Sequence, residues 1–101
     1  MEEINFYDDK GNLKSISYRD AMKEWISSHD SKREFLREVR NAHPTHIQMG
    51  MIVMLQHLEH KHNAKMPQEG DPNYQLDVYD SEIFIEYLNK AIKEMGSVYD
   101  V

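Results

Sequence analysis

The stretch THIQMGMIVMLQHLEHKHN, Thr45 to Asn63, decides the fold of this 101-residue chain. Its periodicity predicts a helix with a core stripe, but Met49, Ile52 and Val53 fall outside that stripe, so the middle of the helix is apolar on nearly every side. Such a helix is either central in a fold or half of an interface. Because a chain this small cannot easily enclose it, we expect a homo-oligomer that buries part of the Met49, Ile52 and Val53 surface.

The residues before this helix predict a β-hairpin and two shorter helices. The hairpin runs from Ile4 to Ser17, and Gly11 supplies the backbone freedom that closes its loop. Ser17 also caps the first short helix, whose apolar residues share one face. A second helix follows the cap residue Ser31 and ends before Pro44, because the residue that precedes a proline avoids the helical region.

The residues after the long helix predict a loop and a last helix. The loop, MPQEGDPNYQLDVYD, is longer than most connections, and its end, Gln75 to Tyr79, can add a short third strand. Asp80 or Ser81 caps the last helix, which carries a clean apolar stripe and closes at Gly96. The whole pattern predicts an α+β fold, with an N-terminal β-hairpin followed by about four helices, in a single domain over residues 1–101.

The composition excludes several classes of protein. The chain has no Cys, which excludes a disulfide scaffold, a thiolate zinc site and a Cys nucleophile, and which suits a reducing compartment. The N-terminus, MEEINFYDDKG, lacks the basic and apolar regions of a signal peptide, and no stretch approaches the roughly 18 apolar residues of a membrane span. We therefore expect a cytoplasmic protein that is not bound to a membrane.

The charge is concentrated in one part of the chain, between Met66 and Asn89, which we call the acidic segment. It holds six acidic residues and no Lys or Arg, and it therefore accounts for the whole formal charge of −6. Phosphate binding needs clustered basic side chains, so the segment disfavours direct nucleic-acid binding and favours a protein partner with a basic surface. A solvated surface that only maintains solubility is the competing explanation. The predicted partner-binding residues are Glu69, Asp71, Tyr74, Asp77, Tyr79, Asp80, Glu82 and Glu86.

The histidines raise a metal hypothesis. Five of the six lie between His43 and His62, and His57 and His60 can meet on one helix face. However, HLEHKH matches no metalloprotease pattern, and a third ligand would have to come from elsewhere, such as His29. Positive charge in the last turn of a helix is favoured by the helix dipole, which explains the histidines there without a metal. We predict no metal site and no cofactor.

Nothing in the sequence arranges a catalytic group. No serine lies in G-x-S-x-G, and the dispersed glycines form neither a phosphate loop nor a dinucleotide-binding motif. We therefore predict no catalytic residue, and an enzyme is the weaker class.

The leading hypothesis is a non-catalytic small acidic protein that binds and regulates or inhibits another protein through an acidic, Tyr-containing surface. The alternative is a small enzyme or metal-binding protein organised around the His43–His62 helix. Convergent His and carboxylate side chains in a concave pocket would favour the alternative, and an open acidic face would favour protein binding.

Overall fold

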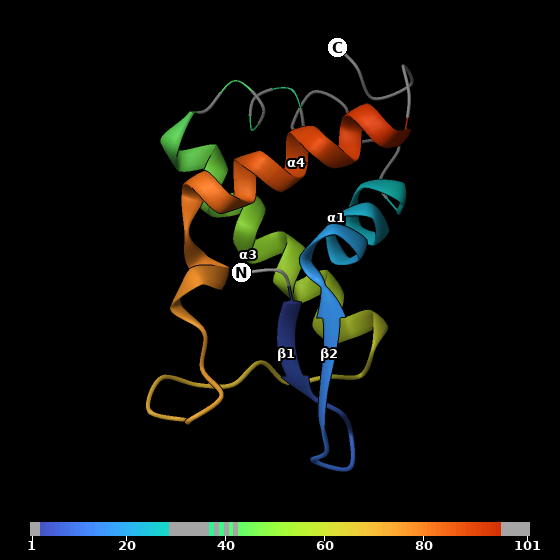
Figure 1. Cartoon of the computed structure of the whole chain (residues 1–101), viewed down its shortest axis with the longest axis vertical. Helices are drawn as coiled ribbons and strands as arrows, with labels where there is room; N and C mark the ends of the chain where they lie inside the picture. Colours follow the sequence, from blue (N-terminus) through green and yellow to red (C-terminus); the bar gives the residue numbers. More distant parts are fainter. Residues whose placement is uncertain (1–2, 29–36, 38, 40, 42, 96–101) are drawn as a thin grey trace.

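The computed structural model describes residues 3–28, 37, 39, 41 and 43–95, and it confirms the α+β class. The helix expected after Ser31 lies almost entirely outside the described residues, which contain three α-helices against the four or so expected for the whole chain. The elements are β1 (Glu3–Tyr7), β2 (Leu13–Ser17), α1 (Tyr18–Ser27), α3 (Pro44–Lys61), the 3₁₀ helix η2 (Leu76–Tyr79) and α4 (Ser81–Met95). Figure 1 shows α4 lying across α1 and α3, with the hairpin extending away from them.

The predicted hairpin is confirmed. Its two strands pair antiparallel, with Ile4 opposite Ile16. Gly11 adopts a φ of +82°, a conformation that glycine reaches at little cost, and this closes the turn. The carboxylate of Asp8 accepts hydrogen bonds from the backbone N–H groups of Lys10 and Asn12 at 2.9 and 2.8 Å. These contacts involve only neighbouring residues, which is why the sequence pattern predicted the turn.

The predicted third strand is wrong. Leu76 to Tyr79 form the 3₁₀ helix η2, and the residue before them explains why. The side-chain amide of Gln75 takes the place of a strand against the outer edge of β1: its oxygen accepts from the N–H of Asn5 at 2.8 Å, and its nitrogen donates to the carbonyl of Glu3 at 3.0 Å. A side chain therefore satisfies the β1 backbone groups that a third strand would have paired.

The same edge is covered further along by backbone pairing. Tyr7 and Lys65 exchange two N–H···O hydrogen bonds, both of 2.8 Å, as an isolated antiparallel bridge. An open strand edge invites pairing with other chains, and here the bridge and the Gln75 amide together close the outer edge of β1.

The core lies between the three α-helices and the hairpin. Gly50 on α3 allows a close approach of α4, because a Cβ atom at this position would lie 3.1 Å from the ring of Phe84. Val53, expected at an outer surface, packs against this core, whereas Met49 and Ile52 are 47% and 56% exposed. The largest fully buried side chains are Trp25, Tyr18, Phe84, Ile4, Met22, Ile26, Met54, Leu58, Leu88, Ile92, Val39 and Val78.

Candidate protein-binding surface

One acid of the acidic segment, Asp71, holds the segment against β1. Asp71, a predicted binding residue, is half-buried, and its carboxylate accepts from the hydroxyl of Tyr7 at 2.9 and 2.8 Å. The side-chain amide of Asn73 donates to the same hydroxyl at 3.0 Å. Asp71 therefore anchors the loop, and its charge is engaged within the molecule.

Directly after the anchored loop, η2 presents two large apolar side chains to solvent. Leu76 is 76% exposed and Tyr79 is 40% exposed. In a 3₁₀ helix, residues three apart lie on the same face, so these two side chains stand one above the other, while Val78 is buried on the other side. The ring of Tyr74 stacks on that of Tyr79, with centroids 5.7 Å apart and an interplanar angle of 24°. We call Tyr74, Leu76 and Tyr79 the η2 ridge.

Leu76 is the member of this ridge that sequence reasoning missed. In the short strand expected from Gln75 to Tyr79, Leu76 and Val78 would share one face, whereas the 3₁₀ helix separates them. The useful signal was the three-residue spacing of Leu76 and Tyr79 directly before the capped start of a helix, because that spacing fits a turn of 3₁₀ helix.

Two of the predicted acidic residues stabilise α4. The carboxylate of Asp80 accepts from the N–H groups of Glu82 and Ile83 at 2.8 and 3.2 Å, as an N-cap residue should. Glu86 lies 3.9 Å from Lys90, one turn further along the helix. Asp80 is exposed, and half or more of the Glu86 side chain faces solvent, so both still contribute negative potential outside the molecule.

Three other acids of the segment have their side chains in solvent. Glu69, Asp77 and Glu82 are all exposed, and none of them forms an ion pair with another residue of the described ranges. Asp77 lies on η2 itself, between Leu76 and Tyr79 in sequence, and Glu82 lies in the first turn of α4, three residues after Tyr79. The ridge is therefore an apolar and aromatic surface beside unpaired negative charge.

The ridge also lies within electrostatic range of α3. Burial raises the pKa of the Tyr79 hydroxyl, and the neighbouring Tyr74 and the carboxylate of Glu59 raise it further. Glu59 belongs to the C-terminal half of α3, so the negative potential around Tyr79 has contributions from two elements that are distant in sequence. An arginine or lysine placed on the open face of this ring would meet both the aromatic face and nearby carboxylates.

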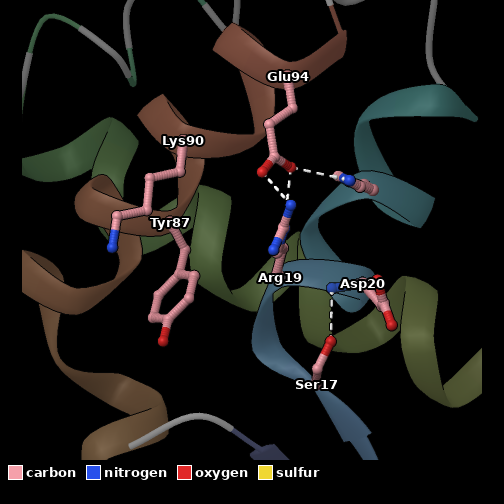
Figure 2. Close-up of a pocket in the computed structure, with 7 residues that line it drawn as sticks. Ser17, Arg19, Asp20, Tyr87, Lys90 and Glu94 are labelled. Carbon is pink, nitrogen blue, oxygen red and sulfur yellow. Dashed lines mark hydrogen bonds and ion pairs between the residues drawn. The ribbon is translucent and has the colours of Figure 1, made fainter.

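A hollow of about 550 Å³ between α1 and α4 has a different chemistry (Figure 2). Glu94 accepts hydrogen bonds from Arg19 and lies 2.8 Å from the ammonium of Lys23. The hydrogen bond from Lys23 lowers the pKa of the Glu94 carboxyl most, and the one from Arg19 lowers it further. The third cation of the hollow, Lys90, lies 5.3 Å from the centroid of the Tyr87 ring. Glu94 therefore already pairs with two of the three cations, Arg19 and Lys23. We call these ion pairs between α1 and α4 the clasp of Glu94.

The histidines do not converge on one point within the described part of the chain, where no three potential metal ligands gather. His57 is half-buried and His60 is exposed on α3. His62 pairs with Glu24 of α1 at 2.8 Å. His29 lies outside the described residues. The arrangement thus offers no observation in favour of an enzyme or metal protein organised around this helix.

Comparison with protein-family models, with curated proteins and with solved structures gave no match for this chain. None of the helices in the described ranges combines the length and the apolar character that a membrane crossing requires.

Proposed function

We propose that this chain is a non-catalytic protein that binds another protein through the η2 ridge and its bordering carboxylates, and that it regulates or inhibits that partner. One observation carries the proposal: Leu76 is 76% exposed on an anchored 3₁₀ turn that places it on the same face as Tyr79, next to the exposed carboxylate of Asp77. A surface that served only solubility would need the charges but not an exposed leucine and a stacked pair of tyrosines. Exposed aromatic and apolar anchors within a charged rim are typical of protein interfaces.

The anchoring of the loop supports this proposal. The hydrogen bonds of Asp71 and Gln75 to β1 hold the chain on the N-terminal side of η2, and the Asp80 cap joins η2 to α4 on the other side. A partner would therefore meet a ridge whose conformation is already set, and binding would cost little ordering entropy.

The partner that fits is a protein with a basic surface. The carboxylates would steer association, since exposed charges act over about 8 Å at physiological ionic strength, while the ridge residues would slow dissociation. We place this interaction in the cytoplasm, which a chain without Cys suits. The segment's charge opposes direct binding to nucleic acid.

The test begins with affinity capture from the native cell extract, followed by binding kinetics with the captured protein. The variant Asp77→Asn/Glu82→Gln removes two unpaired charges beside the ridge and should slow association and weaken its salt dependence. Its matched control, Glu3→Gln/Asp9→Asn, removes two exposed charges from the hairpin and should change neither. Equal association rates and equal salt dependence for the two variants would show that the acidic segment is only a solvated surface.

A further inference from the structure

The outer face of α3 carries exposed apolar side chains that the η2 ridge does not explain. Ile52 and Met49 are 56% and 47% exposed, although the opposite side of the same helix is buried in the core. The exposed residues follow the spacing of a single helical face. We call this set the α3 outer face: Thr45, Gln48, Met49, Ile52 and Gln56.

This face has no charge. From Pro44 to Leu58 the chain contains no Asp, Glu, Lys or Arg, whereas 30% of all its residues are charged. A partner with a basic surface, such as the one proposed for the η2 ridge, would find nothing to pair with here. Exposed polar positions on a helix ordinarily hold charged residues, so an uncharged face that exposes Ile and Met calls for a neutral occupant.

A second copy of this chain meets that requirement. In a two-fold interface the same patch meets itself, so any net charge on the patch would face a like charge from the other copy. The α3 outer face avoids this repulsion completely. The acidic segment, by contrast, would repel its own copy, which excludes it as the self-association surface.

The positions along the helix are also self-complementary. The face extends from Thr45 to Gln56, about 16 Å at 1.5 Å per residue. In an antiparallel pair centred between Gly50 and Met51, Met49 of one copy lies opposite Ile52 of the other, and Thr45 lies opposite Gln56. Apolar groups then meet apolar groups at the centre, and a hydroxyl meets a side-chain amide at each end.

We propose that this protein forms a two-fold homodimer in which the α3 outer faces of two copies pack antiparallel, with the Met49 and Ile52 side chains at the centre. This interface is separate from the η2 ridge and does not depend on the function proposed for that surface.

Sedimentation of the purified chain at micromolar concentration provides the first test. The wild-type chain should sediment as a dimer and the Ile52→Glu variant as a monomer with an unchanged circular-dichroism spectrum. The matched control is Leu13→Glu, at an exposed apolar position of the hairpin that is 47% exposed, and this variant should remain dimeric. A wild-type monomer, or a dimer that persists in Ile52→Glu, would overturn the proposal.

The absence of Cys from the chain allows a second test, of register. The single variants Met49→Cys and Ile52→Cys, mixed and oxidised, should form a disulfide-linked heterodimer faster than either variant links to itself. Cross-linking that is no faster in the mixture than in the separate variants would exclude the antiparallel register. A wild-type monomer whose Ile52→Glu variant loses a protein captured by the wild type would assign the face to a different partner.

Discussion

The hydroxyl of Tyr7 donates to the carboxylate of Asp71, at 2.9 and 2.8 Å from its two oxygens, across 64 positions of sequence. In the order of the loop, this contact comes between two others to β1, the backbone bridge of Lys65 to the same Tyr7 and the hydrogen bond of the Gln75 side chain to Asn5. Because η2 begins directly after Gln75, these contacts decide where the η2 ridge lies relative to the rest of the molecule.

Replacing Tyr7 with Phe should therefore loosen the loop that carries the ridge. The change removes the hydroxyl donor from the half-buried carboxylate of Asp71, which keeps the backbone N–H of Asn73 at 2.8 Å, and we expect it to lower the free energy of unfolding by about 1–2 kcal/mol. Urea unfolding measures this loss. The control is Tyr79→Phe, which removes the hydroxyl of a tyrosine that is 40% exposed and should have little effect on stability. Equal stability of the two variants would mean that the Tyr7 hydroxyl does not anchor the loop.

Replacing Tyr18 with Phe should stabilise the protein. The Tyr18 hydroxyl is fully buried and has no hydrogen-bond partner among the described residues. Removing an unsatisfied buried hydroxyl while keeping the ring, which stacks on Tyr87 at 4.9 Å, should raise the free energy of unfolding by about 1 kcal/mol. Thermal and urea unfolding at pH 7 measure the change. A loss of stability would show that the hydroxyl makes a contact on which the fold depends.

The same residue predicts a loss of stability in alkali. Burial raises the pKa of the Tyr18 hydroxyl far above its usual value, and the negative charge of Asp80 adds to this. The folded state therefore holds the proton more tightly than the unfolded state, and stability should fall as the pH rises above about 10, where an unfolded tyrosine ionises. Unfolding free energies from pH 8 to 11 should fall less steeply for Tyr18→Phe than for wild type. If the free energy of unfolding fell equally steeply with pH in both proteins, the alkaline loss of stability would not come from Tyr18.

The clasp of Glu94 predicts a loss of stability in acid. Hydrogen bonds from Lys23 and Arg19 lower the pKa of Glu94 in the folded state from its ordinary 4.5. The clasp therefore contributes its stability above pH 4.5, and that contribution is lost as the pH falls through the lowered folded value. Thermal unfolding between pH 6 and 3 should show a shallower decline for Glu94→Gln than for wild type. Glu82→Gln, whose carboxylate has no ion pair with a described residue, should follow the wild-type curve.

Replacing Gly50 with Ala should destabilise the packing of α3 against α4. The new methyl group would lie 3.1 and 3.3 Å from two ring atoms of Phe84 and 3.3 Å from Val39. Ala is favoured over Gly within a helix by about 0.5–1 kcal/mol, but overpacking a buried contact costs about 1–3 kcal/mol. We therefore expect a net loss of about 1 kcal/mol in urea unfolding. A more stable Gly50→Ala variant would show that the Phe84 ring moves away freely.

Much of the local structure followed from short-range patterns. The hairpin turn at Gly11, the Ser17 cap of α1 and the Asp80 cap of α4 all appear where the sequence predicts them. The apolar stripe of α4 is confirmed as well, with Phe84, Leu88, Ala91 and Ile92 buried. These features depend on hydrogen bonds and side-chain positions within about four residues of each other, so a single stretch of sequence contains all the groups that decide them.

The candidate protein-binding surface, made of the η2 ridge and the acids of the acidic segment, could be predicted only in part. The acidic segment and its tyrosines were visible in the sequence, but the side chain of Asp71 turns inward to Tyr7, and Leu76 turns outward on a 3₁₀ helix where a strand was expected. Both outcomes depend on which groups already occupy the edge of β1, some 60 to 70 positions earlier in the chain.

The sequence by itself therefore determined the α+β class, the hairpin, the helix caps, the core stripe of α4 and the sign of the charge between Met66 and Asn89. Only the tertiary structure decided which of those charges remain unpaired, and that Val53 packs against the core while Ile52 stays exposed. The physical reason is the distance in sequence between the groups that decide each feature. Backbone geometry and capping are decided between near neighbours in sequence, whereas exposure and pairing depend on what packs against each residue from distant parts of the chain.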